Sequence, residues 1–411
     1  MVDDNEVALK PEIRFPEFSE DWAKRSIDEL LVRKSFAVQP KPGELYREIG
    51  IRSHGKGVFH KPPVTSDELG DKRVFEVVPN TLALNIVFAW EQALAILTDA
   101  ENGFIASHRF PMFSGKARNG NIEFILRLFL RPRGKWLLEL ASPGGAGRNK
   151  TLGQQEFLKL KVTVPSLPEQ QKIAAFLSAV DEKIAQLTQK KALLEEYKKG
   201  CMQQLFSQKF RFKDDQGNDF PDWEEKRLSE VFEEVSERVG ERSVPTFSIT
   251  AGRGFVSQEE KFGRDISGRQ NEHYTVLSPG DFSYNKGNSK TYFYGCVYEN
   301  IRSEQIAVPN VFISFRKRIS GDCSGYFGKL FEAHYLDRHL RRIISSSARM
   351  DGLLNVSKEH FFKIQIPVPH PKEQQKISDF LAGIDRKIDL AEAELQLAQT
   401  FKKGLLQQMF V

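Results

Sequence analysis

The chain has 411 residues, of which 40% are hydrophobic and 28% charged, and its formal net charge is +5. This length exceeds what one hydrophobic core usually supports and predicts two to four domains. The composition is typical of globular proteins and excludes a largely disordered chain, while the mild basic excess permits an anionic partner without requiring one.

The composition also bears on location and on metal or disulfide chemistry. The most apolar stretch, residues 82–97, contains polar side chains and is too short to span a bilayer. The N-terminal residues are acidic and lack the order of a signal peptide. The three cysteines are odd in number, and neither they nor the eight histidines show metal-ligand spacing. We therefore expect a cytoplasmic protein with no membrane contact, disulfide framework or metal site.

The first half of the chain begins as a globular α+β region. After the aromatic segment Phe15–Trp22, a short amphipathic helix is expected at Ser26–Leu30. A second short helix is expected at Glu91–Leu97. Segments rich in β-branched and aromatic residues between turn signals predict strands at 74–78, 82–88, 104–108, 124–130 and 158–164.

A long helix is expected to follow, from residue 166 to 207. Its sequence begins with Glu169-Gln-Gln-Lys-Ile173, and its last residues include Lys198-Lys-Gly200 and Gln203-Gln-Leu-Phe206. Pro168 lies in the first turn, where a missing N–H is tolerated. At about 1.5 Å per residue, this helix would be a rod somewhat over 50 Å long.

The second half repeats this order. A globular region at 208–369 opens with Phe220-Pro-Asp-Trp223 and a short helix at Leu228–Val231, and a further short helix is expected at Ala333–Ile344. A second long helix is predicted at 370–411. Strands are predicted at 274–277, 281–284, 292–297, 311–315 and 362–368.

The two long helices are copies of one sequence. Residues 169–206 align without a gap with residues 373–410, at the displacement of 204 residues that separates Glu169 from Glu373. The globular regions share little beyond their opening aromatic segments. The pattern predicts a pseudo-twofold internal repeat in which the scaffold is duplicated and the globular regions differ.

Alternating steps of four and three residues follow one apolar stripe along each long helix. A repeat of this period over about five heptads is typical of a coiled coil, so we expect the two helices to pair as an antiparallel coiled coil. Lys191, Lys198 and Lys402 fall on the stripe, where the helices either splay apart or meet acidic side chains. The residues expected to pair the helices are Ile173, Leu177, Val180, Ile184, Leu187, Ile377, Leu381, Ile384, Ile388 and Leu395.

Several enzyme motifs are nearly present but incomplete. Residues 50–56 have the spacing of a phosphate loop, but Gly57 stands where serine or threonine would hold magnesium. The carboxylates of residues 222–225 are too compressed for a nuclease cluster. The Asn-Pro-Pro-aromatic tetrapeptide of adenine methyltransferases is absent, and no convincing Ser/His/Asp set can be selected. We therefore expect no catalytic, cofactor-binding or metal-binding residue in this chain.

Basic residues gather in glycine-rich loops of both halves. Five basic residues oppose two acidic ones at 41–61, and six oppose one at 127–150. A solvated face is the better interpretation of any single lysine, whereas clusters in both halves favour contact with phosphates and base edges. The candidates are Arg52, His54, Lys56, Lys61, Arg148, Asn149 and Lys150, and in the second half Arg253, Lys286, Asn288, Lys290 and Arg349.

The order of globular region, long helix, globular region and long helix resembles the specificity subunit of type I restriction–modification systems. The motifs that carry the resemblance are Val164-Pro165 before Glu169–Ile173 and Val368-Pro369 before Glu373–Ile377. The segment Ser142–Arg148 is also similar to the family's pattern. The resemblance covers essentially the whole chain.

The resemblance implies a division of labour. Residues 1–165 and 208–369 would be target-recognition domains that each read one half of a bipartite, asymmetric sequence in double-stranded DNA. The helices at 166–207 and 370–411 would set their spacing and dock two modification (methyltransferase) subunits, which restriction subunits would join. S-adenosylmethionine, ATP and Mg would belong to these partners, with no cofactor and no catalysis in this chain.

Two other interpretations stay open. A stand-alone DNA-binding pseudo-dimer would bind specifically without partners. A coiled-coil scaffold that joins two protein-binding domains would show no steep salt dependence with DNA. A fused methyltransferase–nuclease is disfavoured by the missing motifs.

Overall fold

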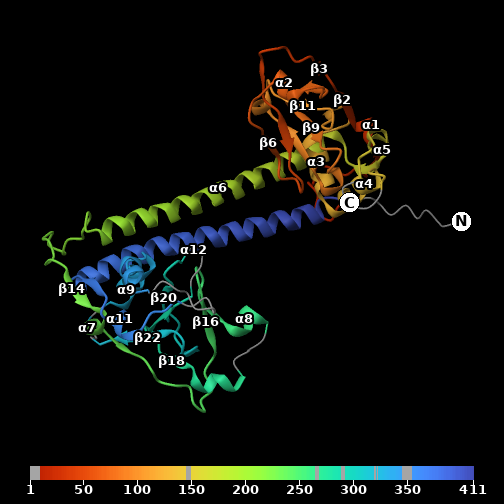
Figure 1. The fold of residues 1–411 in the computed structure, drawn as a ribbon. Helices are drawn as coiled ribbons and strands as arrows, with labels where there is room; N and C mark the ends of the chain where they lie inside the picture. The colour runs from red at the N-terminus through yellow and green to blue at the C-terminus, as the bar shows by residue number, and fades with distance from the viewer. Residues whose placement is uncertain are drawn as a thin grey trace. The chain divides into compact units, whose positions relative to one another are not determined.

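The computed structural model describes residues 10–144, 150–263, 268–287, 292–318, 321, 323–344 and 354–411 (Figure 1). The chain forms two compact units: unit 1 comprises Met1–Thr188 with Ala393–Val411, and unit 2 comprises Gln189–Glu392. The two long helices are α6 (Leu167–Phe206) and α12 (Pro371–Gln408), and each contributes to both units. Among the described helices, none is long and apolar enough to cross a membrane.

The globular part of unit 1 is built on antiparallel sheets. A four-stranded sheet has the order β10-β9-β12-β2, a three-stranded sheet has the order β11-β8-β3, and the remaining strands pair as β1-β13, β4-β7 and β5-β6. The strands are β1 (Ala23–Ser26), β2 (Leu31–Lys34), β3 (Ala37–Val38), β4 (Leu45–Tyr46), β5 (Ile49–Ile51), β6 (Val58–His60), β7 (Val64–Thr65), β8 (Val74–Glu76), β9 (Thr81–Leu84), β10 (Leu94–Leu97), β11 (Ile105–Ser107), β12 (Met112–Gly115) and β13 (Lys161–Val164).

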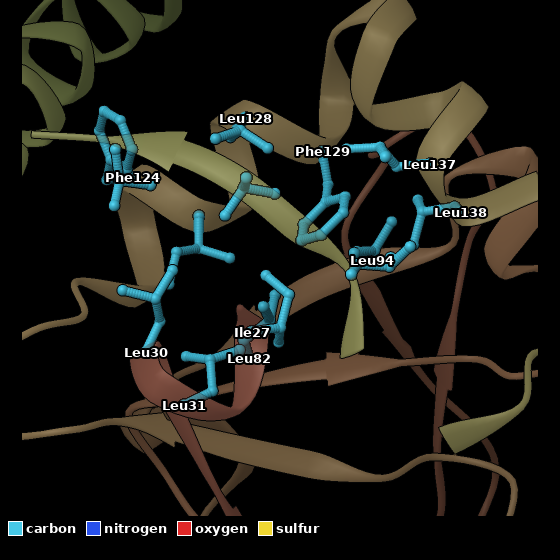
Figure 2. Packing of buried hydrophobic residues seen from close by; sticks show 14 of the residues in the cluster. Ile27, Leu30, Leu31, Leu82, Leu94, Phe124, Leu128, Phe129, Leu137 and Leu138 are labelled. Atoms are coloured by element: carbon cyan, nitrogen blue, oxygen red, sulfur yellow. The ribbon is translucent and has the colours of Figure 1, made fainter. Parts of the chain in front are cut away.

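Helices cover the four-stranded sheet of unit 1. Figure 2 shows Phe124 and Phe129 of α3 gathered with Leu137 of α4 around the sheet residues Leu82 and Leu94. These side chains recur at helical spacing on the buried faces of their helices, which places the main core between helices and sheet. The helices of this part are α1 (Ile27–Leu30), α2 (Ser66–Leu69), α3 (Ile122–Leu130), α4 (Pro132–Leu140) and α5 (Gln154–Lys159), with 3-10 turns η1 (Ala89–Glu91) and η2 (Asp99–Glu101).

Unit 2 has a four-stranded sheet of order β15-β22-β19-β20 and the pairs β14-β23, β16-β17 and β18-β21. Its core is aromatic: Phe232 meets Phe282, Phe315 and Phe327 edge-on. The strands are β14 (Glu224–Arg227), β15 (Phe232–Glu234), β16 (Phe247–Thr250), β17 (Gly254–Ser257), β18 (Thr275–Leu277), β19 (Phe282–Asn285), β20 (Cys296–Glu299), β21 (Ile306–Val308), β22 (Ile313–Lys317) and β23 (Gln365–Val368). The helices are α7 (Leu228–Val231), α8 (Gln258–Phe262), α9 (Ser324–Glu332), α10 (Asp337–Ile343) and α11 (Lys358–Phe362), with η4 (Gly268–His273).

The two units share one strand plan. The order β10-β9-β12-β2 in unit 1 corresponds to β20-β19-β22-β15 in unit 2, and the pair β1-β13 corresponds to β14-β23. In each unit a nine-residue helix, α3 or α9, follows the third strand of that order. The duplication that is legible in the helix sequences therefore extends to the topology of globular regions with little sequence in common. The predicted α+β class is confirmed.

Some local predictions were confirmed and others were wrong. The short helices expected at 26–30 and 228–231 are α1 and α7. Residues 124–130 lie in α3 and not in a strand, because the side chain of Asn121 caps this helix by accepting from the Phe124 N–H at 2.8 Å. Residues 94–97 form β10 and not a helix, because Gln92 adopts a left-handed conformation (φ 58°) that ends η1.

Five other predicted segments begin at least two residues earlier than the elements found. For the strands predicted at 292–297 and 311–315, β20 starts only at Cys296 and β22 at Ile313. The first residues of 158–164 and 362–368 belong to α5 and α11, so the strands β13 and β23 start later. The helix expected at 333–344 starts only at Asp337, after His334 in left-handed conformation (φ 59°).

In unit 1, the start of α6 and the last turns of α12 enter one core. Ile173 and Leu177 of α6 are buried in the same cluster as Leu405 of α12 and Met409, which directly follows α12. Phe410, just after α12, stacks on Phe124 with 5.1 Å between ring centroids. Both helices are therefore part of the hydrophobic core of this unit.

In unit 2, the roles of the two helices are exchanged. Ile377, Leu381 and Ile384 of α12 share a core cluster with Met202 and Leu205 from the end of α6. Lys191 pairs with Glu392 and Lys198 pairs with Asp385, each at 2.5 Å. From the first pair to the second, the chain advances seven residues along α6 and goes back seven residues along α12. Within this unit the two helix segments run antiparallel.

The residues expected to pair the helices are buried or half-buried. Val180, Ile184 and Ile388 are half-buried. The lysines on the stripe meet carboxylates, as in the Lys402–Asp181 ion pair of unit 1 at 2.6 Å. The seven buried positions are Ile173, Leu177, Leu187, Ile377, Leu381, Ile384 and Leu395.

Candidate nucleic-acid interface

The repeated Glu-Gln motif fixes the globular part of unit 1 to the start of α6. The carboxylate of Glu169 is buried and accepts from Arg14 Nε and Nη2 at 2.8 and 2.7 Å, and from Trp22 Nε1 at 3.3 Å. The next residue, Gln170, donates to the carbonyls of Asn119 and Pro165, each at 2.9 Å. The motif therefore holds three separate chain segments on one helical turn.

The second copy of the motif makes the same arrangement in unit 2. Glu373 accepts from Arg211 Nε and Nη2 at 3.1 and 2.8 Å and from Trp223 Nε1 at 3.0 Å. Gln374 donates to the Pro369 carbonyl and accepts from the Cys323 N–H, each at 2.9 Å. Both motifs therefore position a globular region at the start of a long helix.

A second repeated contact joins each globular region to the middle of a long helix. Asp181 of α6 accepts from Arg127 of α3 at 2.8 Å and pairs with Lys402, while Asp385 of α12 pairs with Lys329 of α9 and with Lys198. Burial alone would raise the pKa of both carboxyls, but the hydrogen bonds from these cations bring each pKa below its ordinary value.

This depressed pKa predicts a pH-dependent contribution to stability. Because the folded-state pKa of Asp385 lies below the unfolded one, its stabilisation is complete above about pH 4 and is lost as the pH falls through the folded value. We expect Asp385→Asn to lower the stability of unit 2 by about 1 kcal/mol at neutral pH. Urea unfolding at pH 7 and near pH 3 should show that this difference shrinks in acid. Asp379→Asn, on an exposed part of α12, serves as the control, and a difference that stays constant with pH would refute the assignment.

In unit 1, three predicted site residues lie together in the turn between β5 and β6. Arg52 donates to the Val58 carbonyl at 2.9 Å, and its guanidinium lies 4.8 Å above the Phe59 ring centre. His54 and Lys56 are exposed. The turn is thus internally ordered, and its outer side chains point to solvent.

The backbone of this turn is anchored at both η1 and α3. The N–H groups of His54 and Gly55 donate to the carbonyls of Glu91 and Gln92 at 2.7 and 2.9 Å. Gly55 has φ +62°, and a Cβ at this position would come within 2.6 Å of the Leu130 side chain at the end of α3. Only glycine allows this close approach. The exposed side chains are therefore presented from a fixed backbone.

The other predicted residues of unit 1 lie at the margin of this turn or outside the described residues. Lys61 pairs with Glu48 at 3.5 Å, so its charge is partly compensated. Lys150 lies 5.5 Å from the centre of the Trp90 ring in η1. Arg148 and Asn149 fall outside the described residues.

In unit 2, the corresponding turn connects β16 with β17 and carries Arg253. This side chain is 63% exposed and pairs with Glu260, so its charge is shared with a carboxylate. Lys286 follows Asn285, whose Nδ2 donates to the Ile249 carbonyl of β16 at 3.2 Å. This bond places Lys286 near the same hairpin. Asn288, Lys290 and Arg349 fall outside the described residues.

The candidates selected from the sequence do not include two cations that the fold of unit 1 brings to this surface, although Arg133 was counted in the basic cluster at 127–150. Arg133 in the first turn of α4 and Lys403 near the end of α12 line one groove together with Leu130, the residue against which Gly55 packs. Lys403 belongs to the repeated Lys-Lys-Gly ending of the helices, and this repeat was the available signal. Among the described residues, no group of His, Cys, Asp and Glu has an arrangement suited to a metal ion.

A family model described as the type I restriction modification DNA specificity domain matches residues 80–196 and 221–399. The chain belongs to this family, and the resemblance read from the sequence is confirmed.

Individual relatives are more distant. The type I restriction enzyme MjaVIII specificity subunit of Methanocaldococcus jannaschii is 24% identical over 272 residues, so the match spans 61% of this chain and 61% of that relative. The crystal structure of a type I restriction–modification S subunit from M. genitalium is similar over 98% of this chain and 99% of that one, with 16% identity and a TM-score of 0.55. A second solved structure comes from a study of complex assembly and conformational transition of the type I R-M system. It is similar over 94% of this chain and 96% of that one, with 17% identity and a TM-score of 0.52. The solved structures are likenesses of fold.

Proposed function

We propose that this chain selects the DNA target of a type I restriction–modification enzyme by reading a bipartite, asymmetric sequence with two recognition domains, residues 1–165 and 208–369. One strand plan occurs twice, and its corresponding hairpin turns carry different residues. The turn in unit 1 presents His54 and Lys56, whereas the turn in unit 2 presents Arg253. Like scaffolds with unlike turns fit a protein that reads two different half-sites, and this contrast is the observation that carries the proposal.

The side chains in these turns suit contact with a duplex. Lysine and arginine donate to phosphates and to guanine edges, and asparagine donates to and accepts from adenine. Anchoring of the Gly55 turn reduces the entropy lost on binding, because its backbone is already held by two hydrogen bonds. Arg52 within the turn of unit 1, Lys61 and Lys150 at its margin and Lys286 near the hairpin of unit 2 remain proposed contacts. Arg148, Asn149, Asn288, Lys290 and Arg349, which fall outside the described residues, also remain proposed contacts.

The long helices carry a duplicated apolar surface that suits partner proteins. Leu193 and Tyr197 of α6 in unit 2 are each 56% exposed, and the residues at the repeat displacement, Leu397 and Phe401 of α12 in unit 1, are 71% and 54% exposed. Large exposed apolar side chains commonly mark interaction sites. Two equivalent patches support two copies of one partner, the modification subunit, with restriction subunits joining the assembly. Catalysis, S-adenosylmethionine, ATP and Mg would then belong to these partners.

The test is to express the chain with its modification subunits and to map adenine methylation across host DNA by single-molecule sequencing. One split motif with a fixed unread spacer is the expected result. No new methylated motif from an assembled complex would contradict the proposal and favour a coiled-coil protein scaffold. Specific binding by the isolated chain, with no complex formed, would favour a stand-alone DNA-binding protein.

Substitutions in the hairpin turns test the individual contacts. We expect Lys56→Ala and Arg253→Ala each to weaken binding of the target duplex by about 1–3 kcal/mol if the side chain contacts a base edge. The sequence specificity at that base position should then be relaxed. Fluorescence anisotropy with the complex and methylation mapping measure the two effects. Lys72→Ala, an exposed lysine elsewhere in unit 1, is the control. Unaltered affinity and target choice in both hairpin variants would make the turn assignment wrong.

Substitutions in the duplicated apolar patch test the docking of partners. Tyr197→Ala and Phe401→Ala should each weaken association with one modification subunit, because each removes a large apolar contact. We expect the mass of the complex, measured by analytical ultracentrifugation, to fall by one modification subunit in each single variant at low concentration. Full assembly of the double variant at wild-type affinity would exclude this surface as the docking site.

A further inference from the structure

Each unit has a groove between the end of a nine-residue helix and the end of a long helix. In unit 1 a groove of about 570 Å³ lies between the α3–α4 corner and the last turns of α12. In unit 2 a groove of about 740 Å³ lies between the end of α9 and the last turns of α6. Five helix positions line both grooves at the repeat displacement, and they include the lysine pairs Lys402–Lys403 and Lys198–Lys199.

The two grooves differ in charge. Among the described residues, the groove of unit 1 is lined by four cations, Arg131, Arg133, Lys402 and Lys403, and by no carboxylate. The groove of unit 2 combines its two lysines with four carboxylates, Glu195, Glu332, Asp385 and Asp389. The two grooves therefore occupy equivalent positions in the two units, but the side chains that line them carry opposite net charge.

Two of the four cations of unit 1 are already engaged in the fold. Lys402 pairs with Asp181 at 2.6 Å. Arg131 lies 4.9 Å above the Phe410 ring centre, and its pKa is lowered by burial and by the neighbouring Arg133. Arg131 also donates through Nη1 to the Val411 oxygen at 3.3 Å, so this guanidinium is held within the fold of unit 1.

The other two cations are available to a ligand. Arg133 and Lys403 are exposed, and within the described part of the chain neither has an acidic partner. Arg133 lies three residues after the end of α3. The residue three positions after the end of α9, the corresponding helix of unit 2, is Tyr335. The paired, uncompensated cations are thus a property of the first groove only.

The groove of unit 1 adjoins the candidate reading turn. Leu130 forms part of the groove wall and also packs against Gly55 in the β5–β6 turn. Gln92, whose carbonyl accepts from Gly55, donates through Nε2 to the Phe129 carbonyl at 2.9 Å. Turn and groove are therefore held by the same helix end.

We propose that Arg133 and Lys403 form a seat for a backbone phosphate of double-stranded DNA, next to the β5–β6 turn, and that the equivalent groove of unit 2 does not bind phosphate. This inference rests on the proposed function. A guanidinium and an ammonium group beside apolar walls of Leu130, Pro132 and Leu406 favour a phosphate through charge-assisted hydrogen bonds. The contact adds affinity without sequence information, so the recognition of target DNA is anchored asymmetrically, at the first domain.

The test uses the complete complex with its modification subunits and compares Arg133→Ala/Lys403→Ala with the wild type. Affinity for the target duplex is measured by anisotropy over a series of salt concentrations. We expect the double variant to bind about tenfold more weakly at 0.1 M salt, and its log–log salt slope to fall by about 0.9 for each phosphate that it no longer neutralises. The methylated motif should stay the same. Lys199→Ala, at the repeat-related position of Lys403, should change affinity less than about twofold.

Each outcome decides the proposal. Unchanged affinity and salt slope in the double variant, with the wild type still reading its target, would overturn the phosphate seat and leave the proposed function standing. Equal weakening in the double variant and in Lys199→Ala would overturn the asymmetry. Loss of modification-subunit binding would assign the groove to an acidic protein segment. Lys403→Glu, a single exposed charge reversal, gives a second variant and should weaken DNA binding more than Lys403→Ala. If the wild type reads no sequence, the proposed function itself fails.

Discussion

Replacing Glu373 with alanine should lower the stability of unit 2 by about 3 kcal/mol, since removal of one partner from a buried ion pair costs several kcal/mol. The Glu373 side chain is fully buried, and its two oxygens take hydrogen bonds from Arg211 and Trp223. In the variant, the guanidinium of Arg211 loses its carboxylate and the indole N–H of Trp223 loses its acceptor. Chemical denaturation followed by tryptophan fluorescence should show an earlier transition for this unit.

Two matched variants sharpen this test. Glu196→Ala removes an exposed glutamate of α6 and should shift the transition by less than about 0.5 kcal/mol. Glu169→Ala removes the equivalent carboxylate of unit 1 and should destabilise that unit by a similar amount, because Arg14 and Trp22 make the same contacts there. A Glu373→Ala transition that coincides with that of Glu196→Ala would show that the motif does not hold the fold together.

The repeated motif explains why the helices are duplicated more faithfully than the globular regions. Glu373 and Gln374 bind side chains and carbonyl groups of three chain segments within one helical turn. Every one of these contacts requires a particular helix residue, whereas the sheets need only apolar side chains of suitable size. Substitutions are therefore poorly tolerated where the Glu-Gln motif of a long helix binds a globular region, whereas the exposed hairpin turns can differ in sequence.

The long helices could be predicted from the sequence because their signal is local and repeated. A sustained heptad stripe predicts a helix without knowledge of its partner, and α6 and α12 begin within a few residues of the predicted limits. The lysines on the stripe were ambiguous, because their carboxylate partners, such as Asp385 for Lys198, come from distant sequence. The limits drawn for the recognition domains stay a prediction.

The globular regions were harder to predict because short apolar runs fit both helix and strand. Residues 124–130 combine aromatic and aliphatic side chains in the manner of a strand, and only the Asn121 cap and the packing of Phe124 distinguish the helix. The strand plan shared by the two units was invisible, because topology depends on pairings between distant segments. The candidate site was predicted in part: the turn at Arg52–Lys56 was recognised by its glycines and charges. Arg133 and Lys403 meet only in the folded chain, so no local pattern joins them.

Replacing Phe410 with alanine should lower the stability of unit 1 by about 3–5 kcal/mol, the usual cost of deleting a buried aromatic ring. Phe410 is 4% exposed, stacks on Phe124 and meets Trp22 edge-on at 6.4 Å. The ring also carries the guanidinium of Arg131, so its removal would leave that half-buried charge without its aromatic contact. Unfolding of the variant should be measured by denaturation with fluorescence of Trp22, whose environment changes with this core.

Phe401→Ala is the matched control, because the same substitution removes an exposed ring from α12, the helix that Phe410 follows. We expect it to change stability by less than about 1 kcal/mol, while it weakens assembly with a modification subunit. Phe410→Ala should show the opposite result: its stability is reduced, but it binds the modification subunit normally at temperatures where unit 1 stays folded. The two readouts together separate a residue that stabilises the core of unit 1 from one that the proposed docking surface requires. Equal stability of the two variants would mean that the last residues of the chain lie outside the core of unit 1, contrary to the burial of Met409 and Phe410.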